Sequence, residues 1–220
     1  MVTLEVKPTF ERLKSDKKQQ FIEAAFEEFA LHSFQEASLN RLVKKLGIAK
    51  GSVYQYFDDK QALYFYLKEY VIAKKRTFMQ SAMNIPPDDF WDWLEALFHH
   101  GLAFDAQYPV MNRFLYRYSQ EKLIPEVAKD MVRYDQEAVD FFSSIIAQQQ
   151  EKGILKKNLD ATIMARLIVQ ISKTLLETLA PVEDQPNPLG PVIQVSEAEY
   201  TQALRQLINI LQSGMKKIDN

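Results

Sequence analysis

The chain has 220 residues and a net charge of −2, with 47% hydrophobic and 25% charged residues, which is the composition of a globular chain able to bury a core. It contains no cysteine, which excludes a disulfide framework, a thiolate metal site and a cysteine nucleophile. No apolar run reaches the ~20 residues of a membrane helix, and the N-terminal segment is charged where a secretory signal needs an apolar stretch. We therefore expect a cytoplasmic protein without a membrane partner.

Charge is distributed unevenly along the chain. Residues 1–80 carry 14 Lys/Arg and 10 Asp/Glu, a net +4, whereas residues 81–220 carry 13 and 19, a net −6. A basic front and an acidic rear indicate two segments with different partners, of which the front can meet a polyanion.

The secondary structure is predicted to be entirely helical. Only 6 residues are glycine, and runs of alternating Val, Ile and Thr are missing. Apolar residues instead recur at positions i, i+3, i+4 and i+7, which places one apolar stripe along a helix face. Such stripes occupy residues 22–29, 63–70, 164–171 and 204–211.

Capping residues divide the front of the chain into four helices. Ser15 or Asp16 can cap a helix ending near His32, and Ser38 can cap a short helix ending before Gly47. The remaining two helices are expected over about 50–56 and about 59–83.

Prolines and caps divide the rest, giving about nine helices in all. Residues 181–196 contain four prolines and are expected to form a non-helical connection. The expected breaks are Pro86-Pro87, Pro109, Pro125 and Gly153, and the expected caps are Asp88 or Asp89, Asp160 for a helix to about Ala180, and Ser196 with Glu199 in a capping box.

The segment 38–60, SLNRLVKKLGIAKGSVYQYFDDK, has the spacing of a helix-turn-helix. A short amphipathic helix precedes Gly47, which permits a tight reversal, and Val53 and Phe57 on the second helix are expected to face inward. In such a unit the second helix enters the major groove of DNA and its N-terminal side chains reach base edges. A solvated helix hairpin without a nucleic-acid role has the same spacing, so the pattern alone leaves both interpretations open.

The second helix offers side chains suited to DNA. Lys50 can donate to guanine, and Gln55 can pair bidentately with adenine. Ser52 can bond to bases or phosphates, and Gly51 lets the sugar-phosphate backbone approach closely. Lys60, at the start of the next helix, adds a positive charge beside amide groups suited to a phosphate.

Two stretches match patterns common in one family of regulators. Ile22, Ala25 and Phe29 match the first-helix pattern I-x-x-A-A-x-x-x-F, with Ala24 one place out of register. The second pattern is G-hydrophobic-S-x-G-T/S-L/V-Y-x-Y/H-F-x-x-K-x-x-L. The chain agrees with the second pattern at Gly47, Ile48, Gly51, Ser52, Val53, Tyr54, Tyr56, Phe57, Lys60 and Leu63. Residues 15–67 thus resemble the DNA-binding domain of TetR-type transcriptional regulators.

The resemblance implies roles for particular residues. Ser52 and Tyr54 would contact DNA, Tyr56 would reach a phosphate, and Lys60 would clamp one. Ala49 departs from the family's usual Ser or Thr, so the cap of the second helix is lost, at a cost of about 1 kcal/mol. The expected DNA-binding set is Ser38, Lys50, Gly51, Ser52, Tyr54, Gln55, Tyr56 and Lys60.

The resemblance also implies the architecture and the mode of action. It implies an all-α fold with a helix-turn-helix DNA-binding domain over 1–60 and a helical effector-binding and dimerisation domain over 61–220. The protein would bind a pseudo-palindromic operator as a homodimer, most simply as a repressor. An effector would act by moving the long helix 59–83, which changes the separation of the two recognition helices.

The block 90–142 holds 12 of the chain's 26 aromatic residues. Ordinary core packing explains such a block, and a cavity for an apolar or amphipathic small molecule is the alternative. Arg113 and Arg117, one turn apart, either meet an anionic head group or are surface charge. The expected effector-binding set is Phe104, Tyr108, Phe114, Arg117, Tyr118 and Phe141.

The last two expected helices carry Leu and Ile stripes nearly free of aromatic residues. Such stripes suit a four-helix bundle across a two-fold axis, although a monomer can also bury them against its own helices. A dimer has a functional reason, because it doubles the base contacts on DNA. The expected interface set is Leu167, Ile171, Leu175, Leu204, Leu207 and Leu211.

A search for enzyme chemistry finds little. The sequence has no HExxH, GxSxG, Walker or GxGxxG motif, and His99 and His100 are adjacent, so they point apart on a helix. We expect no catalytic residues, no metal site and no cofactor. The alternative to a regulator is an all-α small-molecule-binding protein or enzyme with a structural helix hairpin.

Overall fold

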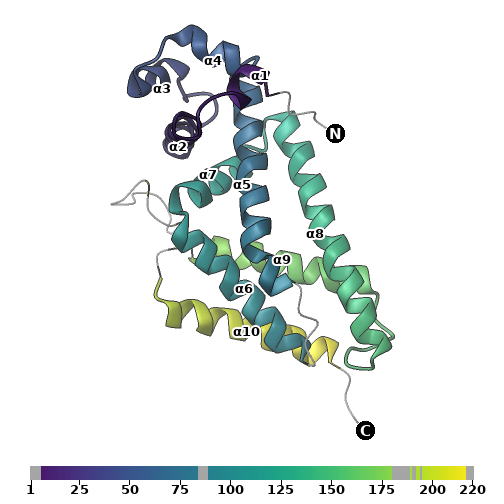
Figure 1. Cartoon of the computed structure of the whole chain (residues 1–220). Helices are drawn as coiled ribbons and strands as arrows, with labels where there is room; N and C mark the ends of the chain where they lie inside the picture. The colour runs from purple at the N-terminus through teal and green to yellow at the C-terminus, as the bar shows by residue number, and fades with distance from the viewer. Residues whose placement is uncertain (1–5, 84–88, 180–188, 190–191, 194, 217–220) are drawn as a thin grey trace. The chain divides into compact units, whose positions relative to one another are not determined.

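The computed structural model describes residues 6–83, 89–179, 189, 192–193 and 195–216. This part of the chain holds ten α-helices (Figure 1) and no β-strand, with one isolated bridge between Leu155 and Lys216. The predicted all-α class is confirmed. The helices are α1 (Pro8–Glu11), α2 (Ser15–Leu31), α3 (Leu39–Leu46), α4 (Lys50–Tyr56), α5 (Lys60–Met83), α6 (Phe90–Gln107), α7 (Pro109–Gln120), α8 (Pro125–Glu151), α9 (Ala161–Leu179) and α10 (Glu197–Met215).

Most helix boundaries lie where capping chemistry predicts them. Asp160 accepts hydrogen bonds from the amides of the first turn of α9, and Ser196 forms the predicted capping box with Glu199. Gly47 and Gly153 end their helices with φ of 65° and 77°, a left-handed conformation that favours glycine. α7 and α8 begin at the predicted prolines.

The other boundaries include one wrong prediction, one helix that was not predicted and one confirmed cap. α2 begins at Ser15 with Lys14 as its N-cap, so the prediction that Ser15 or Asp16 caps it is wrong. α1 was not expected, because four residues are too few for a periodic pattern. Asp89 accepts hydrogen bonds from two amides of α6, as expected of a cap. Pro86-Pro87, Asp88, Ala180 and most of the expected connection 181–196 lie outside the described residues.

The chain packs as two compact units. The first comprises 1–78, 105–122 and 185–192, and the second comprises 79–104, 123–184 and 193–220. Within the first unit α2 packs on α3 and α7, α3 on α4, and α1 on α4. Within the second, α9 packs on α8 and α10. The division into domains at residue 60 stays a prediction.

An aromatic core holds the first unit together. Phe26 and Phe29 of α2, Tyr64 of α5, and Phe114 and Tyr118 of α7 are all buried. The Phe114 ring centroid lies 5.3 Å from those of both Phe26 and Tyr64, in edge-on geometry. Burying one such side chain stabilises the fold by about 1.5–3 kcal/mol. The helix-turn-helix segment is thus built on the same core as α7.

The second unit has a mixed aromatic and aliphatic core. Phe90 and Trp93 of α6 pack together, with ring centroids 5.7 Å apart. The indole N–H of Trp93 donates to the Ala82 carbonyl at 2.9 Å, so this buried polar group is satisfied. Ile168 of α9 and Leu204 of α10 are fully buried in the same cluster. The apolar stripes of the last two helices therefore serve their own unit's core.

Candidate DNA-binding surface

α3 is fixed at both ends by its own sequence. The Ser38 hydroxyl accepts from the Arg41 amide at 3.4 Å, which is the predicted N-cap. At the other end, Gly47 in the left-handed conformation donates its amide to the Lys44 carbonyl. Leu42 and Val43 are buried beneath. The turn into α4 is therefore set by the glycine rather than by packing alone.

α4 presents one face inward and leaves the other open. Val53 and Phe57 are each 1% exposed, which confirms the prediction that they face the core. Tyr54 is 45% exposed despite its size. The position of Tyr54 on this open face agrees with a role in contacting DNA. On the remaining α4 positions of the expected set, Lys50, Gly51 and Gln55 are exposed and Ser52 and Tyr56 are half-buried.

A carboxylate of α2 anchors the start of α3. The Glu28 side chain accepts from the Ser38 amide at 2.6 Å and from the Arg41 guanidinium at 2.6 and 3.0 Å. Burial raises the pKa of Glu28, but the hydrogen bonds from Arg41 and Ser38 outweigh it and hold the pKa below its ordinary value. Ser38 thus has a structural task in the free protein, with its amide and hydroxyl both bonded.

Lys60 also has structural partners. Its ammonium donates to the Gln35 carbonyl at 3.2 Å and the Ala37 carbonyl at 3.1 Å, and lies 4.7 Å from the centroid of the Phe34 ring. A cation at a helix N-terminus opposes the helix dipole, so these carbonyls help to hold it there. The expected phosphate contact stays a prediction, since the half-buried ammonium retains a third N–H.

We expect Lys60→Met to lower the free energy of unfolding by about 1–2 kcal/mol, because two carbonyls lose a charged donor. If Lys60 also meets a phosphate, the slope of log affinity for DNA against log salt becomes less negative by about 0.9. Urea denaturation and salt titration measure the two effects. Lys157→Met, which removes the same charge from an exposed site of the second unit, is the control. Unchanged stability would contradict the carbonyl contacts, and an unchanged slope the phosphate contact.

The expected effector-binding residues divide between the two units. Tyr108, Phe114, Arg117 and Tyr118 belong to the first unit, and Phe104 and Phe141 belong to the second. The expected set therefore splits between two separately packed cores.

Most of these aromatic residues pack against neighbours within their own unit. Phe114 and Tyr118 are buried in the aromatic core beside α2. Tyr108 receives the Lys74 ammonium at 4.5 Å from its ring centroid. Phe141 packs against Phe142 and Trp93. These contacts agree with the core-packing interpretation of the aromatic block.

The two arginines of α7 are both half-buried in the structure. Arg117 donates through Nε to the Ala30 carbonyl at the end of α2, at 3.0 Å. Burial and repulsion from Arg117 lower the pKa of Arg113. One turn further along, Glu121 accepts from the Phe34 amide at 2.5 Å. Arg117 of α7 thus binds the end of α2, and Glu121, the C-cap of α7, binds the segment between α2 and α3.

The expected interface residues divide by exposure. Leu175, Leu204 and Leu211 are buried in the core of the second unit, so they are occupied within the monomer. Leu167 is 48% exposed, and Ile171 and Leu207 are half-buried. An interface formed by this set would therefore depend on Leu167, Ile171 and Leu207.

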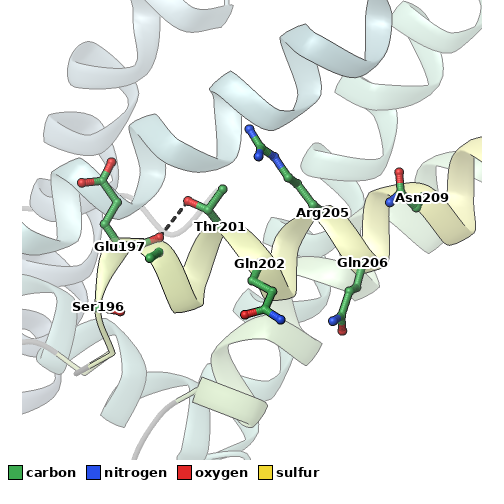
Figure 2. Close-up of a pocket in the computed structure, with 8 residues that line it drawn as sticks. Ser196, Glu197, Thr201, Gln202, Arg205, Gln206 and Asn209 are labelled. Atoms are coloured by element: carbon green, nitrogen blue, oxygen red, sulfur yellow. Dashed lines mark hydrogen bonds between the residues drawn. The ribbon is translucent and has the colours of Figure 1, made fainter.

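Two of the hollows among the described residues involve α10. The larger is lined by one helix, with residues such as Thr201, Gln202 and Arg205 spread along it (Figure 2). The smaller lies between α6 and α10. Neither of these two hollows is lined by any of the six expected effector residues. The described residues contain no group of three or more potential metal ligands, and no helix there has the length and apolar character to cross a membrane.

An all-helical arrangement in the described residues, with a helix-turn-helix whose second helix keeps one face open, is typical of DNA-binding proteins of the helix-turn-helix class. Comparison with known proteins gives the family. Residues 21–67 match the model of the bacterial regulatory proteins of the tetR family, and residues 88–216 match that of the tetracyclin repressor-like C-terminal domain. The chain belongs to the TetR family and is a DNA-binding transcriptional regulator.

Individual relatives agree with this assignment. The HTH-type transcriptional repressor SCO4008 of Streptomyces coelicolor is 24% identical over 155 residues, which is 70% of this chain and 76% of the relative. A TetR family regulator from Chloroflexus aurantiacus is 26% identical with a TM-score of 0.70, over 97% of this chain and 99% of the other. SmeT bound to triclosan, from Stenotrophomonas maltophilia, shares the fold at 16% identity and a TM-score of 0.68, over 92% and 93% of the two chains.

Proposed function

We propose that the chain is a homodimeric repressor that seats α4 of each protomer in successive major grooves of a pseudo-palindromic operator. The supporting observation is the division of α4 into a buried face, Val53 and Phe57, and an open face that includes Lys50, Tyr54 and Gln55. The major groove of DNA is wide enough to admit an α-helix, and polar side chains on the exposed face of that helix can reach the base edges. A two-fold dimer places the two copies about one helical turn of DNA apart.

Repression and response to a small molecule are carried over from relatives. SCO4008 is a repressor by name, and SmeT is the repressor of a multidrug efflux pump and binds triclosan. An apolar or amphipathic effector suits the chain's aromatic content. Because Phe104, Phe114 and Tyr118 are each buried in the free chain, an effector that contacts any one of them would have to displace packed side chains. We place the protein in the cytoplasm with its DNA, and we assign it no catalytic activity.

Selection of bound fragments from random duplexes, followed by salt titration, tests the proposal. Affinity for the selected duplex should fall steeply with salt, with a slope of roughly −0.9 for each neutralised phosphate. Gln55→Ala should lose about 1–3 kcal/mol of discrimination at one base position, since a bidentate pair to adenine is removed. Gln202→Ala, an exposed glutamine of α10, is the matched control. No preferred duplex for the wild type, or the same preference in Gln55→Ala, would count against it.

A further inference from the structure

The C-terminal end of α4 needs hydrogen-bond donors from elsewhere in the chain. The last four carbonyls of an α-helix have no partner within it. In α4 the Phe57 amide binds the Val53 carbonyl at 2.8 Å, which leaves the carbonyls of Tyr54, Gln55 and Tyr56. A helix of 7 residues has little stability of its own, so the partners of these three groups matter.

The segment before α2 supplies all three donors. The Lys7 ammonium donates to the Tyr54 carbonyl at 2.8 Å, and the Lys7 amide donates to the Tyr56 carbonyl at 3.1 Å. The Thr9 hydroxyl donates to the Gln55 carbonyl. Lys7 also pairs with Asp58, just beyond α4, at 2.7 Å. Consecutive carbonyls of the recognition helix are thus capped by residues far away in sequence.

Phe10 fixes this segment to the core. Its side chain is fully buried, with ring centroids 5.0 Å from Phe57, 5.4 Å from Tyr56 and 5.5 Å from Tyr66. Pro8 stands at the start of α1, where its fixed φ suits the first helical turn. The donors of Lys7, the N-cap of α1, and of Thr9 within α1 are therefore held beside α4, because Phe10 packs against both Tyr66 of α5 and Phe57.

The opposite end of α4 has no comparable support. Ala49 occupies the N-cap position and carries no side-chain oxygen to accept from the first-turn amides. The Cβ-free Gly51 lies in the first turn, which weakens that end further. The tilt of α4 therefore depends on its C-terminal end more than in a helix capped at both ends.

We propose that Lys7, Thr9 and Phe10 are positioning residues for DNA recognition, which hold α4 at its productive tilt without themselves reading the DNA. The proposal rests on the proposed function, because it assumes that α4 is the helix that meets the duplex. Lys7 and Thr9 act by capping, and Phe10 acts by anchoring the two caps. This role requires the Thr9 hydroxyl, the Lys7 ammonium and the Phe10 ring.

Thr9→Val in the full-length chain is the most direct test, because it removes the hydroxyl and keeps the shape. Hydrogen exchange without DNA should be about two- to tenfold faster at the α4 amides, and affinity for the selected duplex should fall by a similar factor. The salt slope should stay the same, and so should the melting temperature within about 2 °C. Thr77→Val, where a helix carbonyl likewise loses a threonine hydroxyl, should change none of these.

Lys7→Met and Phe10→Leu complete the test. Lys7→Met should speed α4 exchange with no change in salt slope, whereas a slope less negative by about 0.9 with unchanged exchange would assign Lys7 to a phosphate and overturn its positioning role. Phe10→Leu, which keeps an apolar anchor, should retain more protection of α4 than Phe10→Ala. Unchanged exchange and affinity in Thr9→Val would overturn the inference while wild-type binding stands, whereas absence of binding by the wild type would refute the proposed function instead.

Discussion

Replacing Phe114 with alanine is expected to lower the free energy of unfolding by about 3–5 kcal/mol. Phe114 is fully buried and its ring meets those of Phe26, Phe29, Tyr64 and Tyr118. Truncation removes the transfer free energy of the ring and leaves a cavity among aromatic neighbours too stiff to fill it. A loss of this size is a large share of the 5–15 kcal/mol that stabilises most domains. Urea denaturation followed by circular dichroism measures it.

The same substitution separates two interpretations of the aromatic block. If Phe114 lined an open effector cavity, Phe114→Ala would leave stability nearly unchanged and would weaken effector binding alone. Phe141→Ala is a useful comparison, because Phe141 is half-buried in the second unit and should cost less. A loss below about 1 kcal/mol for Phe114→Ala would contradict the packed core described above.

The sequence predicts the helices well because their boundaries are governed by local chemistry. Ser38, Asp160 and Ser196 cap helices within a few residues of themselves, and Gly47 and Gly153 adopt the positive φ expected of helix ends. The inward face of α4 follows equally from the spacing of two apolar residues. Contacts of this kind are encoded over one or two turns, so periodicity and capping suffice to predict them.

Contacts between distant segments are not predictable in this way. Nothing local to Thr9 indicates that it meets the Gln55 carbonyl, and only Pro8 hints at the short helix α1. Composition likewise groups Phe114 with Phe141, although the chain places them in different units. Lys60 matches a family pattern, but its bonds to the carbonyls of 35 and 37 depend on how α5 meets the turn before α3. Each of these features depends on a tertiary contact that a local pattern does not encode.

Leu167→Glu is expected to weaken self-association at least about 30-fold, since losing a central apolar contact costs about 2 kcal/mol or more. Ile163 and Leu167 lie one turn apart on α9 and are 62% and 48% exposed, while Met164 and Ile168 on the same helix are buried. α9 therefore has one apolar face inside its own unit and a second that is open in the free chain. We infer that a second copy covers this open face, since the proposed operator complex is a dimer.

Sedimentation equilibrium over a range of protein concentrations measures the change, and a full palindromic operator should lose affinity far more than a half-site does. Leu and Glu have similar helix propensities, so the monomer should keep its helix content. Leu123→Glu is the matched control, because Leu123 is 99% exposed and lies between α7 and α8. Equal dimerisation of wild type and Leu167→Glu would place the interface elsewhere. Loss of dimer in Leu167→Glu alone, with folding intact, would assign it to α9, because a buried carboxylate without a partner is costly at an apolar interface and harmless in water.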